Sequence, residues 1–198
     1  MTQEEKKSYA LGIAVGINYR SMNFKVDEQV FAKGVSDALN GRKQELSDEE
    51  ITQIFTQLQA EIEEQELARR AVEMGEERTF LEANRQKPGV RETASGLQYK
   101  IITESIGKKP VATDIVEVHY HGQLIDGTVF DSSVARGSTM TFPLNQVIQG
   151  WTEGLQLMSE GSKFEFYIPS HLAYGDRDMG VIKPYSTLIF EIELFKVN

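Results

Sequence analysis

The chain has 198 residues, a formal net charge of −9 at pH 7 and no cysteine. Without cysteine it can form no disulfide, use no thiolate in catalysis and bind no cysteine-ligated zinc. An acidic surface repels phosphate backbones and no basic stripe offsets it, so nucleic acid is not an expected partner. Hydrophobic residues make up 40% of the chain, which is enough to form a buried core.

Residues 1–7 lack the basic start and apolar run of a signal peptide. No apolar run approaches the ~18 residues that a membrane-spanning helix needs. We therefore expect no membrane span and a cytoplasmic location. A mature protein whose signal peptide had been removed would show the same N-terminus, so a periplasmic or cell-surface location is the alternative.

The first part of the chain has helical periodicity. Apolar residues recur at three- to four-residue intervals from Tyr9 to Ile17 and again from Val30 to Leu39. We expect residues 1–46 to form a helical domain.

These helical stripes are too few to close a core within one chain. Helical sets below about 70 residues usually need a partner to complete their core. We therefore expect a homodimer whose core includes Phe24, Phe31 and Phe55. Ordinary packing of these rings within one chain is the alternative.

A long connecting helix is expected over residues 47–90. A capping box at Ser47 to Glu50 places acidic residues in its first turn, and Pro88 marks its end. The helix itself should run for about 35 to 40 residues, which at ~1.5 Å per residue is roughly 55 Å. Residues 63–66 are polar all round, so this helix should cross solvent between two bodies.

From Ser95 onward the apolar period changes to two, which is typical of strands with one buried face. Asp126-Gly127 predicts a hairpin, and residues 147–158 predict a short helix. We expect an α+β domain over residues 93–198. Its antiparallel, twisted sheet should have five to six strands wrapped on that helix.

Aromatic residues gather on the apolar faces of these strands: Tyr120, Phe130, Phe142, Trp151 and Phe190, with Tyr174 in a nearby loop. Composition alone would assign them to an ordinary core. Five motifs occur in order: VHYHG at 118–122, DGTVFDSS at 126–133, VIQGW at 147–151, LAYG at 172–175 and STLIFEIEL at 186–194. Over residues 95–198 their sequence and spacing resemble the FK506-binding (FKBP) family of peptidyl-prolyl cis/trans isomerases.

The first half resembles, more loosely, the dimerising extension of bacterial two-domain FKBPs of the macrophage-infectivity-potentiator type. That resemblance rests on Ser8-Tyr9-Ala10-Leu11-Gly12 and on the stretch at residues 34–38.

The FKBP resemblance implies a proline pocket and its residues. The catalytic residues would be Asp131, Tyr174, Tyr120 and Phe190, and the substrate- or inhibitor-binding residues Phe130, Arg136, Phe142, Val147, Ile148, Trp151 and Ile182. Trp151 would form the floor, while the Ile148 N–H and the Tyr174 hydroxyl would bind substrate carbonyls. Such a pocket requires no metal and no cofactor.

The resemblance also implies the partners: proline-containing unfolded or partly folded polypeptides, and macrolides such as tacrolimus or rapamycin. We expect an isomerase with chaperone activity in its dimeric helical arm. The alternative is a non-catalytic chaperone or interaction module that uses the prolyl pocket only for docking.

Several residues have competing interpretations. Asp131 could instead cap a surface turn onto Ser133, and His119 and His121 could share a metal rather than lie on a solvated strand face. Residues 176–183 carry more charge than is common in the family, which should alter the residue preferred before proline. Gln149 and Met140 are milder departures.

Overall fold

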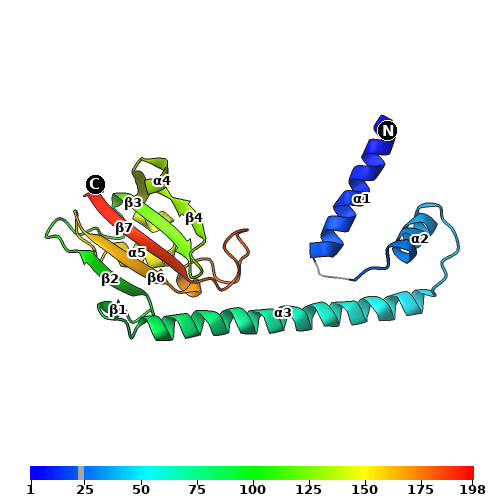
Figure 1. Cartoon of the computed structure of the whole chain (residues 1–198), viewed down its shortest axis with the longest axis horizontal. Coiled ribbons are helices and arrows are strands. Elements are labelled where there is room, and N and C mark those ends of the chain that lie inside the picture. Colours follow the sequence, from blue (N-terminus) through cyan, green and yellow to red (C-terminus); the bar gives the residue numbers. More distant parts are fainter. Residues whose placement is uncertain (22–24) are drawn as a thin grey trace. The chain divides into compact units, whose positions relative to one another are not determined.

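The computed structural model describes residues 1–21 and 25–198. It forms two compact units, Met1–Leu67 and Ala68–Asn198. Three helices come first: α1 (Gln3–Ser21), α2 (Glu28–Leu39) and α3 (Asp48–Asn84) (Figure 1). The periodicity predicted all three, and α3 ends just ahead of the Lys87-Pro88-Gly89 sequence that was expected to stop it.

Local capping explains where two of these helices begin. The Asp27 carboxylate accepts hydrogen bonds from the first N–H groups of α2. At α3 the Glu50 N–H donates to the Ser47 hydroxyl at 3.2 Å, and the Ser47 N–H donates to the Glu50 carboxylate at 2.8 Å. These two bonds confirm the predicted capping box.

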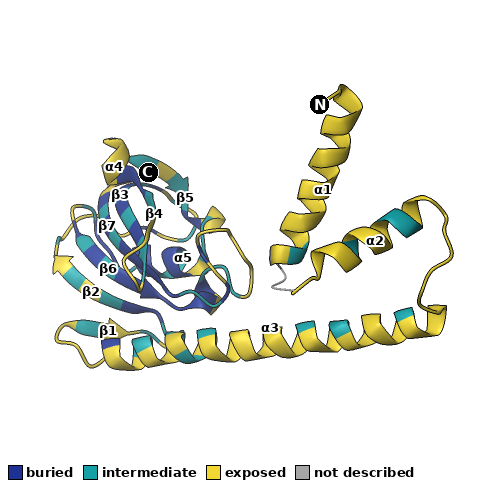
Figure 2. Cartoon of the chain, turned by 45° about the vertical axis from the view of Figure 1, so that its right-hand side comes forward, coloured by how far each residue is buried: buried dark blue, intermediate teal, exposed yellow. Residues whose placement is uncertain are grey.

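The first unit has no core of its own. Among its described residues none is buried, and its helices are exposed along most of their length (Figure 2). Tyr19 and Phe31 join α1 to α2 by an edge-to-face contact of 5.3 Å between ring centroids. Phe55 is 63% exposed, and Phe24 lies outside the described residues.

The last turns of α3 belong to the second unit, so this part of the helix is not the wholly solvated bridge that the sequence suggested. Asn84 is fully buried and donates to the Gln98 side chain at 2.9 Å. Phe80 lies 6.2 Å from the ring of Tyr167. The anchor was not foreseen because it combines one aromatic ring with polar side chains, which leave no apolar stripe.

The second unit contains one antiparallel sheet of seven strands, in the order β1-β2-β6-β7-β3-β4 with β5 also paired to β3. The strands are β1 (Val90–Glu92), β2 (Gln98–Thr103), β3 (Ile115–Leu124), β4 (Val129–Ser132), β5 (Met140–Pro143), β6 (Lys163–Ile168) and β7 (Leu188–Val197). The α+β class is therefore confirmed. The short strands β1 and β5 were not predicted, because they have no alternating apolar pattern.

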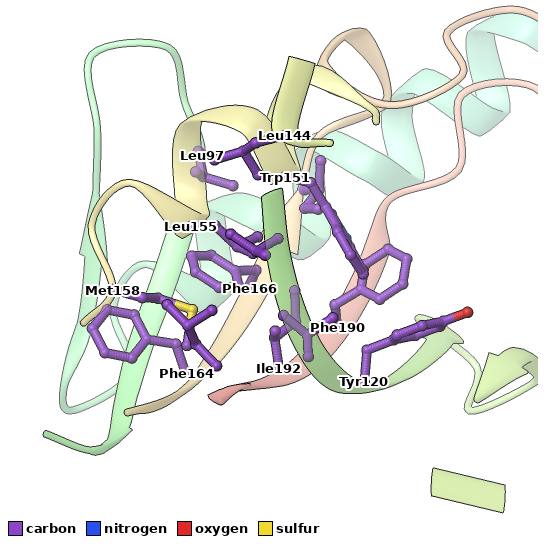
Figure 3. Packing of buried hydrophobic residues seen from close by; sticks show 14 of the residues in the cluster. Leu97, Tyr120, Leu144, Trp151, Leu155, Met158, Phe164, Phe166, Phe190 and Ile192 are labelled. Carbon is purple, nitrogen blue, oxygen red and sulfur yellow. The ribbon is translucent and has the colours of Figure 1, made fainter. Parts of the chain in front are cut away.

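Short helical segments complete this unit: α4 (Ser133–Arg136), η1 (Leu144–Gln146), α5 (Gln149–Leu155) and η2 (Ser170–Leu172). The core lies between α5 and the sheet. Figure 3 shows Trp151, Phe190 and Tyr120 together at one end of this core, and Met158 and Phe164 at the other. Among the described residues, no helix combines the length and apolar character needed to cross a membrane.

Glycine is required where α5 meets the sheet. A Cβ at Gly154 would lie 2.7 Å from the Phe166 ring, which is closer than carbon atoms can approach. The Gly154→Ala substitution should therefore lower the free energy of unfolding by about 1–3 kcal/mol. Thermal or urea unfolding measures this change.

Gly75 in α3 is the matched control, since a Cβ there would meet no atom within 4 Å. Gly75→Ala should be neutral or stabilising by about 0.5–1 kcal/mol, because alanine favours the helix. Equal effects of the two substitutions would contradict the assigned packing.

Candidate functional site

A group of perpendicular aromatic rings surrounds one indole. The ring centroids of Tyr120, Phe142 and Phe190 lie 5.2, 5.5 and 5.2 Å from that of Trp151, at interplanar angles of 77°, 89° and 81°. Phe130 packs edge-to-face on Phe190 at 5.4 Å. Such edge-to-face pairs are favourable beyond the area they bury. The rings reach Trp151 from β3, β5 and β7, so only the folded sheet brings them together.

The closeness of two of these rings depends on Gly122. A Cβ at this position in β3 would lie 2.7 Å from both Phe130 and Phe190. The glycine in the VHYHG motif is therefore a packing requirement of the aromatic group.

The rings line a cleft of about 820 Å³. Nine of the eleven residues predicted for the pocket line it: Tyr120, Phe130, Asp131, Phe142, Val147, Ile148, Trp151, Tyr174 and Phe190. Trp151 is only 5% exposed, yet it borders the same opening as Tyr174. The indole is therefore not sealed beneath other side chains, a condition on which a prolyl site depends.

Arg136 and Ile182 are the two predicted residues that do not line the cleft. Ile182 is buried in the core cluster that adjoins the aromatic rings. Arg136 at the end of α4 binds the Asp131 carboxylate and donates to the Tyr120 hydroxyl at 2.8 Å. Its role is therefore to hold other groups of the site.

Asp131 is held by these two side chains. The Tyr120 hydroxyl donates to its carboxylate at 2.5 Å, and Arg136 binds the other oxygen. Burial raises the pKa of Asp131, but hydrogen bonds from Tyr120 and Arg136 and the charge of Arg136 outweigh it, so the pKa lies below its usual value. Burial and the bond to Asp131 raise the pKa of Tyr120. The pair is therefore an ionised carboxylate beside a neutral phenol at pH 7.

The alternative that Asp131 caps a turn onto Ser133 does not match this geometry. Ser132 caps α4, because its hydroxyl accepts the Ala135 N–H at 3.2 Å. The Ser133 hydroxyl bonds to the backbone N–H of Tyr120 at 2.8 Å. Asp131 instead lines the cleft, with its carboxylate bonded to Tyr120 and Arg136.

The two predicted donors to substrate are unpaired. Neither the Ile148 N–H nor the Tyr174 hydroxyl donates to any group within residues 1–21 and 25–198. Both residues line the cleft. They can therefore donate to carbonyl oxygens of a bound chain without breaking an existing hydrogen bond.

The structure also brings residues to the cleft that sequence reasoning did not assign to it: Gln146, Gln149, His171, Ala173, Gly175, Asp176 and Arg177. Most of them come from the segment around Tyr174. The sequence carried a signal for several of them. Ala173 and Gly175 belong to the LAYG motif, Gln149 to the VIQGW motif, and Asp176 and Arg177 to the charged segment 176–183.

His119 and His121 each contact a serine. Their Nδ1 atoms lie 3.0 Å from the Ser133 hydroxyl and 3.1 Å from the Ser132 hydroxyl. Within the part of the chain that the structure describes, no group of three or more His, Cys, Asp or Glu side chains is arranged to hold a metal.

Two family models match the chain. The first, described as FKBP-type peptidyl-prolyl cis-trans isomerase, covers residues 107–195, and the second, described as the domain amino terminal to FKBP-type peptidyl-prolyl isomerase, covers residues 4–101. An FKBP-type peptidyl-prolyl cis-trans isomerase FkpA from Aeromonas hydrophila is 47% identical, with 98% of this chain and 76% of that protein covered. The FKBP-type 22 kDa isomerase of Escherichia coli is 42% identical, with 99% and 96% covered.

Solved structures agree with these matches. The crystal structure of FkpA from Escherichia coli aligns with a TM-score of 0.73 and 34% identity, covering 100% of this chain and 97% of that one. An isomerase from Pseudomonas syringae aligns with a TM-score of 0.61 and 42% identity, covering 65% and 95%.

The expected cytoplasmic location is wrong. A relative from Legionella longbeachae, 41% identical with 100% of this chain and 87% of that protein covered, is named outer membrane protein MIP. Net charge and composition do not separate the compartments, so the expectation rested on residues 1–7 and on the lack of a long apolar run.

The lowered pKa of Asp131 gives a prediction for stability against pH. A carboxyl whose pKa is lower in the folded than in the unfolded chain stabilises the fold above its unfolded value, about 3.9, and loses that effect as pH falls through the folded value. Wild type should therefore be more stable than Asp131→Asn near pH 7, by at most about 1 kcal/mol because the side chain is half exposed. The difference should shrink below about pH 4.

Urea unfolding from pH 7 to pH 3 measures this difference. In an Arg136→Gln background the Asp131→Asn effect should be smaller, because the cation that favours the carboxylate is gone. A stability difference between aspartate and asparagine at position 131 that does not change with pH would contradict the role of the carboxylate. A difference of equal size with and without Arg136 would contradict the role of that cation.

Proposed function

The chain belongs to the FKBP-type peptidyl-prolyl cis-trans isomerases, and we propose that its aromatic cleft is the site at which X-Pro bonds rotate. The substrates of the family contain proline, so the cleft must accept a proline ring and the amide before it. The observation that carries the assignment is that Trp151, the Ile148 N–H and the Tyr174 hydroxyl border one opening.

The chemistry requires an environment and few reacting groups. Rotation about an X-Pro bond breaks amide resonance and has an unaided barrier of ~18–20 kcal/mol. The planar amide is more polar than the twisted one, so water stabilises the ground state and a dry aromatic cleft favours the twisted state. An acceleration of ~10⁴ to 10⁶ corresponds to about 5–8 kcal/mol.

In this proposal Trp151 forms the floor under the proline ring, and Phe130, Phe142, Val147 and Phe190 form the walls. The Ile148 N–H and the Tyr174 hydroxyl bind substrate carbonyls. Asp131, oriented by Tyr120 and Arg136, lies beside the rotating amide. Ile182 acts indirectly, because it is buried in the same core cluster as Tyr120, Trp151 and Phe190.

We further propose that the chain acts as a homodimer. The absence of any buried residue among the described part of Met1–Leu67 supports this, because such a unit cannot pay its folding entropy without a partner. In this division of labour residues 1–46 dimerise, residues 47–90 connect and residues 93–198 catalyse. The dimeric arm would hold unfolded polypeptides near the pocket and raise their local concentration.

Macrolides such as tacrolimus or rapamycin are proposed ligands of the same cleft. The charged segment 176–183 contributes Asp176 and Arg177 to the lining of the cleft, and it contains an ion pair of 3.1 Å between Lys183 and Asp178. The charges of this segment should weaken contacts with an apolar macrolide. A docking module without catalysis is less favoured, because the relatives are named as isomerases.

Removing either polar group at the cleft should slow the reaction. We expect Tyr174→Phe and Asp131→Leu each to lower kcat/KM for an X-Pro tetrapeptide by threefold or more, equivalent to about 0.7 kcal/mol. A protease-coupled or NMR exchange assay measures this.

Ile106→Ala is the control, since this side chain is fully exposed and lies outside the cleft. It should retain wild-type kcat/KM. If neither Tyr174→Phe nor Asp131→Leu lowers kcat/KM, the proposed site is wrong.

The dimer can be tested by sedimentation. Phe55→Asp places a charge on the exposed apolar side of α3 and should shift the full chain from dimer to monomer. Gln57→Asp adds the same negative charge at a position about 200° around the helix from Phe55. This variant should leave the dimer intact. A monomeric wild type, or equal behaviour of both variants, would contradict the proposal.

A further inference from the structure

A carboxylate on α3 reaches the turn that precedes Tyr174. Glu77 accepts a hydrogen bond from the Ser170 N–H at 2.5 Å and lies 3.0 Å from the Ser170 hydroxyl, which donates to its second oxygen. Ser170 begins η2 and is buried, and Pro169 before it supplies no side-chain cap. N–H groups at the start of a helical turn have no partner within the turn. Glu77 therefore caps η2 from a separate element.

The capped turn leads directly to Tyr174. The Ser170 carbonyl accepts hydrogen bonds from the Ala173 N–H and the Gly175 N–H, both at 2.9 Å. These two residues flank Tyr174, and all three line the cleft. A displacement of Ser170 would therefore move the backbone on both sides of the tyrosine.

Glu77 also lies near the far end of the same segment. The hydroxyl of Thr187, which is buried and directly precedes β7, is 3.5 Å from the Glu77 carboxylate. At this distance the second contact is weak, so Ser170 is the main partner. Both ends of residues 170–187 nevertheless lie beside one carboxylate.

The helix is fixed where it makes these contacts. The Gln98 side-chain amide donates to the Leu81 carbonyl at 2.9 Å. The Asn84 side chain donates to the Gln98 amide oxygen, also at 2.9 Å. Positions 77, 81 and 84 lie on one face of α3. Because Gln98 belongs to β2, these two hydrogen bonds tie the end of α3 to the sheet, close to Glu77.

We propose that Glu77 is a positioning residue of the isomerase, holding the turn at Ser170 so that the Tyr174 hydroxyl is directed at a substrate carbonyl. This inference rests on the role proposed above for Tyr174. A carboxylate suits the task because its two oxygens accept from the N–H and the O–H of one residue. Without it the buried Ser170 N–H is unpaired and the turn loses its cap.

The test uses the full-length protein and an X-Pro tetrapeptide. Glu77→Ala should lower kcat/KM roughly three- to tenfold, because small misplacements of a substrate-binding group are costly. Glu77→Gln should restore most of this loss, since its amide oxygen can accept the Ser170 N–H. Glu76→Gln makes the same change on the neighbouring, exposed residue and should leave kcat/KM unchanged.

A double-mutant cycle separates positioning from mere stabilisation. In a Tyr174→Phe background, Glu77→Ala should change kcat/KM less than about twofold, since the group it positions is gone. An equal loss in both backgrounds, or a lower melting temperature with wild-type kcat/KM, would overturn the positioning role. If Tyr174→Phe alone retains wild-type kcat/KM, the role of Tyr174 fails, and that of Glu77 with it.

Discussion

The isomerase unit depends on aromatic rings packed at right angles around a single indole. Tyr120, Phe142 and Phe190 stand against Trp151 at 5.2 to 5.5 Å, and Gly122 leaves the space in which Phe130 and Phe190 approach each other. These rings also line one cleft. In the proposed reaction a dry surface favours the twisted X-Pro amide, and the packing that stabilises the core would supply that surface.

Polar side chains border the aromatic rings and are held by hydrogen bonds. Arg136 and Tyr120 hold the Asp131 carboxylate, whose pKa therefore stays low at the rim of the cleft. The Ile148 N–H and the Tyr174 hydroxyl belong to residues that line the same cleft, and they donate to no group within the described residues. Glu77 joins this arrangement from α3, so the helix that leaves the first unit also ends as a structural part of the second.

The first unit follows a different physical rule. Its helices have good caps and clear periodicity, yet none of its described residues is buried. Secondary structure alone does not offset the entropy of folding. The exposed apolar side chains of α1, α2 and the start of α3 are the surface that the proposed homodimer would bury, and such burial would stabilise this unit.

The sequence by itself determined the three helices and the α+β class, because periodicity and capping are local properties. Trp151, Tyr174 and Asp131 were assigned to one site by the resemblance of five ordered motifs to the FKBP family, without any knowledge of distance. Only the tertiary structure decided the rest: β1 and β5, the burial of Ile182 in the core cluster, the cap that Glu77 gives to Ser170, and the hydrogen bond from Asn84 to Gln98. The reason is physical: each of these features depends on which segments meet in the fold, and such pairings leave no period in the sequence.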